Sequence, residues 1–114
     1  MSWGHAVSRD LLHWEQKDDV LFPDETGTMF SGSGIVNDRK MLGLPEDAVI
    51  FFYTAAGNNN KWSAGKQFTQ RIAYSTDLLK WEQTDGVRHA AYINKMAYAA
   101  QTYSNTGNLC MTVQ

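Results

Sequence analysis

The sequence predicts an all-β fold, specifically part of a β-propeller, and three observations support this. The segment HAVSRDLLHWEQ at residues 5–16 recurs as IAYSTDLLKWEQ at residues 72–83, with eight of twelve positions identical. The two copies are 67 residues apart, and strand-like runs separated by polar turns fill the interval. About four short strands repeated at a fixed period are the content of a propeller blade.

Each copy of the repeat is predicted to form a strand–turn–strand corner. Residues 5–8 and 71–75 are half-apolar runs that end in serine, and Asp10 and Asp77 follow two positions later. Serine and aspartate side chains accept hydrogen bonds from turn amides, so a turn explains why both recur. A helix over SRDLLHWEQ is also compatible with its caps and leucines, but the flanking runs favour strands.

Further strands are predicted between the two copies. Residues 27–36 are rich in glycine, which suits a strand that another backbone or a ligand approaches closely. After a turn at 37–40, residues 48–54 are almost continuously apolar and are expected to be buried on both faces. A polar loop at 56–61 leads to a strand at 70–75.

Repeat arithmetic predicts an incomplete propeller. A chain of 114 residues holds one and a half to two blades of this period, whereas a closed propeller needs about 4–8 blades. The last residues differ from the rest, because alanine and methionine at 95–103 favour helix. We therefore predict a partial propeller domain over 1–94. The tail over 95–114 is predicted to be irregular or partly helical, either disordered or the product of a frameshift.

Composition excludes several classes of protein. The apolar fraction of 43% and the charged fraction of 19% are those of a globular protein. A net charge of −2 supports neither a nucleic-acid nor a membrane partner, and no apolar run reaches membrane-spanning length. Cys110 is the only cysteine, so an internal disulfide and a cysteine-type zinc site are excluded. No motif for a metal or a cofactor is visible.

Five segments together carry a resemblance to a known family. The sequence resembles glycoside hydrolase family 32, the invertase, levanase and inulinase group, in WGHAVSRDLLHW at 3–14, LFPDE at 21–25, FSGS at 30–33, YTAAG at 53–57 and QRIAYSTD at 70–77. The resemblance covers residues 1–94 and implies a five-bladed propeller with an active site at its axis. It also implies retaining hydrolysis of a fructosyl bond, which uses two carboxylates about 5–5.5 Å apart.

The acidic motifs of the family are missing from this sequence. The family's nucleophile lies in Asn-Asp-Pro-Asn-Gly and its transition-state aspartate in Arg-Asp-Pro, and neither motif occurs here. The acid/base lies in Glu-Cys, but Cys110 follows Leu109. Asp24 and Glu25 are adjacent and would point apart on an extended chain, so they make a poor acid/base pair. We therefore predict no catalytic residue in this chain and no hydrolase activity from it alone.

Phe30 and Ser31 are the predicted substrate-binding residues. The resemblance places them on the wall of the sugar pocket, where the serine hydroxyl exchanges hydrogen bonds with sugar hydroxyls and the ring walls the site. The alternative is that Phe30 belongs to the core and that Ser31 is an ordinary strand residue beside a close-packed glycine.

The remaining aromatic and histidine candidates are weaker. Trp3 and His5 lie near the pocket in the family, although His5 suits a structural, hydrogen-bonded role equally well. Trp14 and Trp81 recur in the repeat, which favours packing over sugar stacking. Trp62 follows three asparagines in a loop and could contact a longer substrate.

Two functions remain open at this point. The first is a fragment of a glycosidase that hydrolyses fructosyl bonds in sucrose, levan or inulin, with a fructose-containing sugar or polysaccharide as its partner. The second is a non-catalytic sugar-binding or assembly protein of two blades, which would close its open sheet edge by oligomerising. Extracellular or periplasmic location fits relatives that cleave polymers, and cytoplasmic location fits those that cleave sucrose.

Overall fold

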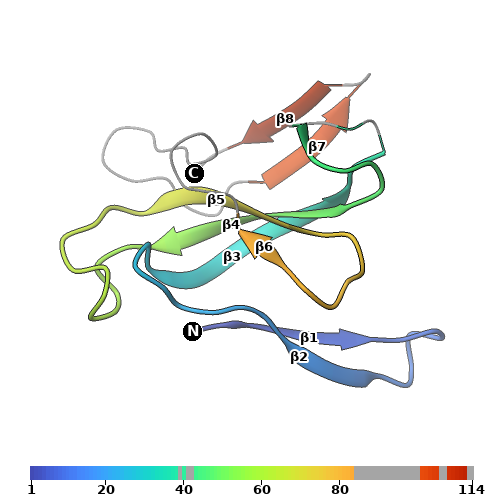
Figure 1. Ribbon diagram of the computed structural model, residues 1–114, viewed down its shortest axis with the longest axis horizontal. Helices are drawn as coiled ribbons and strands as arrows, with labels where there is room; N and C mark the ends of the chain where they lie inside the picture. Colours follow the sequence, from blue (N-terminus) through green and yellow to red (C-terminus); the bar gives the residue numbers. More distant parts are fainter. Residues whose placement is uncertain (39, 41–42, 84–100, 106–107, 113–114) are drawn as a thin grey trace.

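The fold is built from antiparallel strands joined by turns and loops. The computed structural model describes residues 1–38, 40, 43–83, 101–105 and 108–112, the last two ranges by their backbone (Figure 1). The strands are β1 (Trp3–Val7), β2 (Glu15–Leu21), β3 (Thr28–Val36), β4 (Val49–Ala56), β5 (Thr69–Ser75), β6 (Glu82–Gln83), β7 (Gln101–Asn105) and β8 (Asn108–Thr112). Within these ranges, no helix has the length and apolar character needed to cross a membrane.

The strands form three sheets that follow the order of a propeller. β1 pairs with β2, the strands β3-β4-β5-β6 form one four-stranded sheet in chain order, and β7 pairs with β8. A four-stranded antiparallel sheet with sequential neighbours is one blade. The two copies of the repeat lie on β1–β2 and on β5–β6, so β1–β2 corresponds to the last two strands of the preceding blade. The predicted all-β, partial-propeller class is confirmed.

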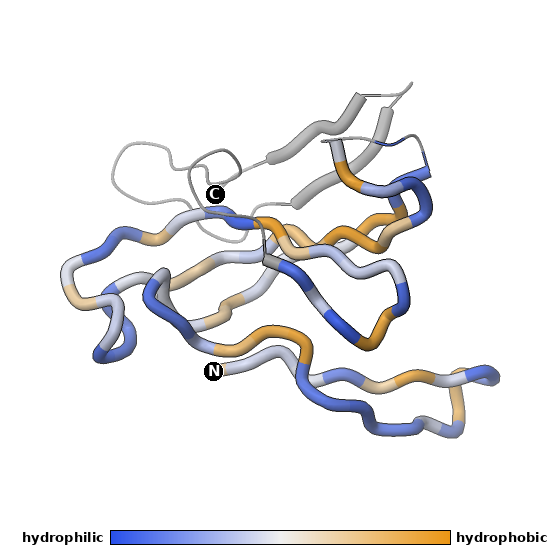
Figure 2. Tube along the Cα trace, viewed as in Figure 1, coloured by the Kyte–Doolittle hydropathy of each residue, from blue (hydrophilic) through white to orange (hydrophobic). Residues whose placement is uncertain are grey.

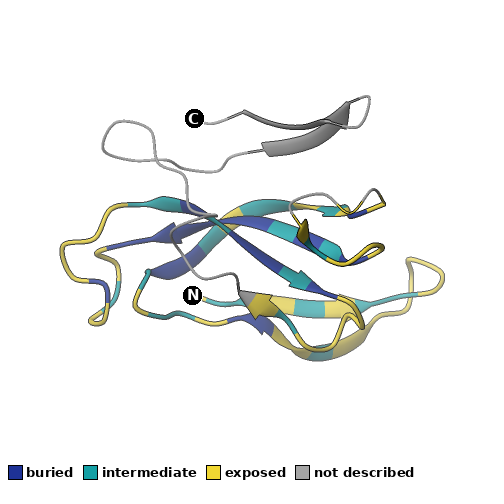
Figure 3. Cartoon of the chain, turned by 45° about the horizontal axis from the view of Figure 1, so that its top comes forward, coloured by how far each residue is buried: buried dark blue, intermediate teal, exposed yellow. Residues whose placement is uncertain are grey.

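β4 is the centre of the complete blade, as its apolar sequence predicted. It pairs with β3 on one side and with β5 on the other, so neither of its edges is open. Phe52, Tyr53 and Ile50 on β4 are almost completely buried. The apolar stretch of the chain and the buried stretch coincide there (Figures 2 and 3).

Aromatic rings join the β1–β2 sheet to one face of the blade. The Trp3 ring lies 5.1 Å from Phe51 between ring centroids, and Phe51 stacks on Trp81 at 4.1 Å with an interplanar angle of 8°. These three rings pack against a buried cluster that includes Leu21 of β2 and Tyr53 of β4. The opposite face of the blade has its own cluster, formed by Ile50, Phe52 and Ile72.

The two corners of the repeat have the same turn geometry. The Ser8 hydroxyl oxygen accepts a hydrogen bond from the Leu11 amide at 2.8 Å, and Ser75 accepts one from Leu78 at 2.9 Å. Leu11 and Leu78 both have a left-handed backbone, with φ of 65° and 64°. Because the side-chain hydrogen bonds hold this conformation twice, they explain why the sequence repeats at these positions.

The repeated aspartates complete the turns, which confirms their predicted capping role. Oδ1 of Asp10 accepts hydrogen bonds from the amides two and three residues later at 2.9 and 2.8 Å, and Asp77 does the same at 2.8 and 2.9 Å. The amide donors lower the pKa of both carboxyls, since they favour the charged form. The His13 ring, 2.6 Å from Asp10, adds to the effect in the first corner.

Two expectations from the sequence are corrected by the structure. The described part of the tail forms the β7–β8 hairpin rather than helix, because β7 contacts β3 and pairs with β8; residues 95–100 lie outside the described residues. Trp14 does not pack as Trp81 does, and it is 59% exposed. Trp81 has the Phe51 ring to stack on, whereas the described part of the chain places no element in that position beside Trp14.

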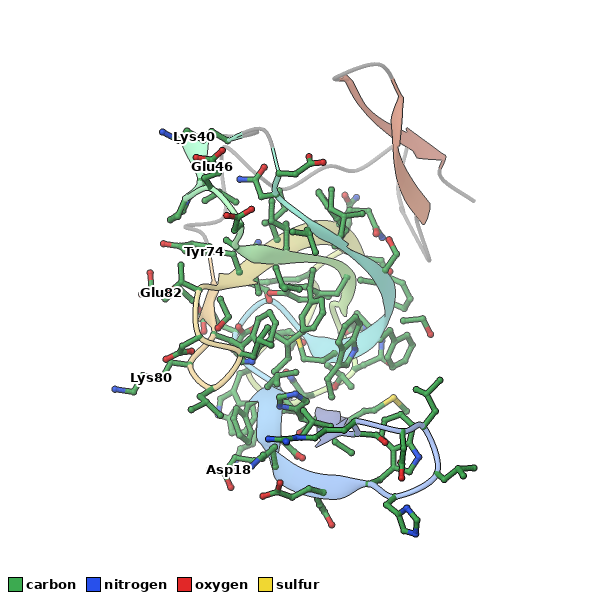
Figure 4. All side chains as sticks on the ribbon, turned by 90° about the vertical axis from the view of Figure 1, so that its right-hand side faces the viewer. Asp18, Lys40, Glu46, Tyr74, Lys80 and Glu82 are labelled. Atoms are coloured by element: carbon green, nitrogen blue, oxygen red, sulfur yellow. The ribbon has the colours of Figure 1, made fainter. Side chains whose placement is uncertain are left out.

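The outer end of the blade is polar. Tyr74 of β5 donates a hydrogen bond from its hydroxyl to Oε2 of Glu82 at 2.7 Å, which supports the short strand β6 (Figure 4). Asp18 of β2 and Lys80 of the β5–β6 corner line a groove of about 900 Å³ between the two sheets. This groove contains neither of the predicted substrate-binding residues.

Candidate substrate-binding site

Phe30 and Ser31 form a β-bulge near the beginning of β3. Met29 pairs with Ala55 and Gly32 pairs with Tyr53, so two residues of β3 stand opposite the single residue Thr54 of β4. A bulge breaks the alternation of the strand and directs side chains away from the regular ladder. The two sequence-predicted residues therefore occupy the one irregular point of the β3–β4 pairing.

The bulge is fixed from the neighbouring sheet. Nε1 of Trp3 donates a hydrogen bond to the backbone carbonyl of Phe30 at 2.9 Å. One residue earlier, the Met29 amide donates to the Met1 carbonyl at 3.1 Å. The Trp3 ring also meets Tyr53 edge-on, with centroids 6.2 Å apart. Trp3 is thus a positioning residue that ties the bulged backbone to β1.

The bulge is also supported from within the blade. Thr54, which stands opposite it, is fully buried and accepts a hydrogen bond from Nε2 of Gln70 on β5 at 2.8 Å. A Cβ atom on Gly32 would come within 1.9 Å of the Phe52 carbonyl oxygen. Gly32 therefore lets β3 return to β4 at very short range directly after the bulge. This close approach confirms the prediction that another backbone comes near the glycine-rich run at residues 27–36.

The two bulge side chains differ in exposure. Ser31 is exposed, so its hydroxyl can both donate and accept hydrogen bonds at the surface. Phe30 is half-buried, and its ring meets Phe68 edge-on at 5.8 Å and 85°. The result is an aromatic wall of two rings beside an accessible hydroxyl, which suits a ligand that has both apolar faces and hydroxyl groups.

A polar hollow lies at the same end of the blade. It has a volume of about 290 Å³ and is lined by Thr26, Lys66, Gln67, Thr69 and Arg71. Arg71 stands directly opposite Tyr53 in the β4–β5 pairing.

Tyr53, which pairs with Arg71, has an unusual hydroxyl group for a buried residue. It is completely buried, and its hydroxyl has no hydrogen-bond partner within the described part of the protein. Burial raises its pKa to about 12, and the nearby charge of Arg71 only partly offsets this rise.

Two acidic residues, Asp24 and Glu25, precede the bulge in the chain. Oδ1 of Asp24 accepts hydrogen bonds from the amide and the hydroxyl of Thr26, at 2.8 and 2.5 Å, which orients this carboxylate within its own turn. Glu25 is exposed. Across the described residues, no group of three His, Cys, Asp or Glu side chains lies close enough to hold a metal ion.

The sequence and the structure agree only in part about this site. His5 lies on β1 opposite Lys17, in the sheet that carries Trp3. Phe68 and Gln70 support the bulge, but sequence reasoning missed both as site residues. Their only signal was their position, with Phe68 two residues before the strand predicted at 70–75 and Gln70 at its first residue.

A four-stranded antiparallel sheet with its strands in chain order, beside a second strand pair, defines the class of protein as a β-propeller. Residues 1–108 match the profile of the glycosyl hydrolases family 32 N-terminal domain. The chain is 40% identical over 80 residues to a levanase of Bacillus subtilis, covering 68% of this chain and 11% of that protein. It is 38% identical over 86 residues to an invertase of Schizosaccharomyces pombe, covering 66% of this chain and 14% of that protein. This chain belongs to glycoside hydrolase family 32.

The fold comparison agrees with this assignment. A family 32 β-fructofuranosidase from Bombyx mori superposes with a TM-score of 0.75 at 20% identity, over 99% of this chain and 23% of that one. The chain thus spans about a tenth to a quarter of the length of these proteins. The family profile reaches residue 108, beyond Asn94, where the resemblance was predicted to end. The domain division at 94 stays a prediction.

Proposed function

We propose that this chain supplies part of the substrate-binding wall of an enzyme that hydrolyses fructosyl O-glycosidic bonds in sucrose, levan or inulin. The observation that carries the proposal is the bulge, in which the exposed Ser31 hydroxyl follows the half-buried Phe30 ring. The relatives are named levanase, fructan β-fructosidase and invertase, and the substrates of all three contain fructose.

We infer that the reaction is a retaining hydrolysis and that the 114-residue chain alone does not perform it. Retention needs a nucleophilic carboxylate and an acid/base carboxylate about 5–5.5 Å apart. The sequence lacks Asn-Asp-Pro-Asn-Gly, Arg-Asp-Pro and Glu-Cys, the three motifs that would bring the acids. In this proposal the chain binds the fructosyl group, and carboxylates outside these 114 residues act on the bond.

The test measures binding and hydrolysis separately on the pure chain. Isothermal titration with fructose and with a short inulin oligosaccharide should show binding, and no fructose should be released from sucrose, inulin or levan. Ser31→Ala should weaken binding roughly fivefold, because one hydrogen bond contributes about 1 kcal/mol. Thr76→Ala is the control, since Thr76 is also an exposed hydroxyl residue but lies in the β5–β6 corner. An equal loss in both variants would refute the role of Ser31, and fructose release would refute the inactivity.

A non-catalytic sugar-binding or assembly protein of two blades is the second candidate. The observation that favours it is the edge of β1, because among the described strands β1 pairs only with β2. An unpaired edge is a template for a strand of another chain. Sedimentation velocity decides this point: a defined oligomer that binds inulin supports the assembly protein, whereas a monomer that binds neither sugar refutes both candidates.

A further inference from the structure

Trp62 is exposed on a loop that the structure holds rigidly. The loop joins β4 to β5, and Trp62 is 57% exposed on it. Large apolar side chains at the surface are informative when their backbone is fixed, because a fixed aromatic ring loses little entropy on binding a ligand.

Asn60 is the centre of the hydrogen bonds that hold the loop. Its Oδ1 accepts from the Trp62 amide at 3.1 Å and from the Ser63 amide and hydroxyl at 2.9 and 2.7 Å. Its Nδ2 donates to the Asp24 carbonyl at 3.1 Å. The same side chain thus shapes the turn that carries Trp62 and joins this turn to the segment before β3.

The joined segments border a second hollow, which is open to solvent. It has a volume of about 260 Å³ and is lined by Pro23, Asp24, Glu25 and Trp62. At about 30 Å³ per water, this volume corresponds to roughly nine waters, which is the scale of one sugar ring. The Lys61 ammonium lies over the Trp62 ring, 5.1 Å from its centroid, and so takes up one face of the indole. The rest of the ring, beside the carboxylates of Asp24 and Glu25, suits a neutral ring with several hydroxyl donors.

This hollow and the bulge lie at the same end of the blade. The loop that carries Trp62 ends at Phe68, whose ring contacts Phe30. The Thr28 hydroxyl, two residues before Phe30, donates to the Asn59 carbonyl at 3.4 Å. In Figure 1 the β4–β5 loop and the start of β3 lie together at the left, opposite the β1–β2 corner. One extended ligand could therefore contact both places.

We propose that Trp62, Asp24 and Glu25 form a second sugar subsite, which binds a further unit of a fructan chain whose terminal unit lies against Phe30 and Ser31. This inference rests on the proposed function and adds a preference to it. An oligosaccharide should bind more tightly than free fructose, and the difference should depend on Trp62.

The experiment compares Trp62→Ala with Trp14→Ala in the full 114-residue chain. Trp14 is the matched control because it is 59% exposed but lies at the β1–β2 corner, which belongs to the neighbouring two-stranded sheet. Urea unfolding first shows that both variants have the stability of the wild type. Titrations with fructose and with an inulin oligosaccharide of about five units then give the affinities.

We expect Trp62→Ala to bind the oligosaccharide roughly tenfold more weakly and to bind fructose unchanged, while Trp14→Ala matches the wild type. Asn60→Ala should reproduce part of the loss, because it releases the loop without removing the ring. If Trp62→Ala binds the oligosaccharide as tightly as the wild type does, the subsite is overturned and the proposed function stands. If the wild type binds neither sugar, the proposed function itself fails.

Discussion

Replacing Gly32 by alanine tests whether the bulge depends on a close approach of two backbones. The added Cβ would lie 1.9 Å from the Phe52 carbonyl oxygen and 2.6 Å from the Tyr53 Cα. Both contacts are with backbone atoms of the central strand, which cannot rotate away. Relief requires that β3 and β4 separate by more than an ångström at the point where the bulge returns to the ladder.

The expected cost is at the upper end of the range for overpacked cores, about 3 kcal/mol. Such a loss is a large part of the 5–15 kcal/mol that stabilises a typical domain. With a urea m-value of about 1.5 kcal/mol/M, it lowers the midpoint of unfolding by about 2 M. Inulin binding should weaken in parallel, because Phe30 and Ser31 lie directly before Gly32.

The matched control is Gly4→Ala in β1, where the nearest atom to an added Cβ is Oδ1 of Asp19 at 3.9 Å. This contact is ordinary, so Gly4→Ala should change the free energy of unfolding by no more than about 1 kcal/mol. Urea unfolding followed by tryptophan fluorescence measures both variants. If Gly32→Ala unfolds at the midpoint of the wild type, the argument that a close backbone approach holds the bulge is refuted.

Two further predictions concern titrating groups. Burial raises the pKa of Tyr53 to about 12, so stability is complete below pH 10 and falls as the pH approaches 12. At pH 9, Tyr53→Phe should unfold at the same urea midpoint as the wild type. At pH 11 the wild type should lose about 1 kcal/mol of its free energy of unfolding, and Tyr53→Phe should not. An equal loss in both proteins would refute this. Turn amides lower the pKa of Asp77 below 3.8, so its contribution is present above that value and is lost as the pH falls. Asp77→Asn should lower the thermal midpoint more at pH 7 than at pH 3, while Asp38→Asn, an exposed control, should have little effect at either pH.

The corners and the central strand could be predicted because their signals are local. Ser8 and Asp10 bond to amides within three residues, and so do their counterparts in the second copy. A turn that is held by its own side chains has a recognisable sequence motif, and two copies of this motif define the period of the repeat. The position of β4 could be predicted for a similar reason, since a strand that is buried on both faces needs an unbroken apolar run.

The tail and Trp14 show where local signals fail. Alanine-rich sequence favours helix only weakly, and the contact of β7 with β3 together with its pairing to β8 outweighs that preference in the described part of the tail. The repeat predicted equal packing for Trp14 and Trp81, but packing depends on what lies beside each ring. Only Trp81 has the Phe51 ring to stack on.

For the candidate site, the sequence predicted the pair Phe30 and Ser31 through the family motif, together with a glycine-rich strand that allows close approach. Only the tertiary structure shows that these two residues form a bulge. It also shows that Trp3, 27 positions earlier, holds the bulged carbonyl. Asn60 similarly joins Trp62 to a segment 36 residues away. Such contacts leave no periodic trace in the sequence, because they depend on how the strands and loops meet in space.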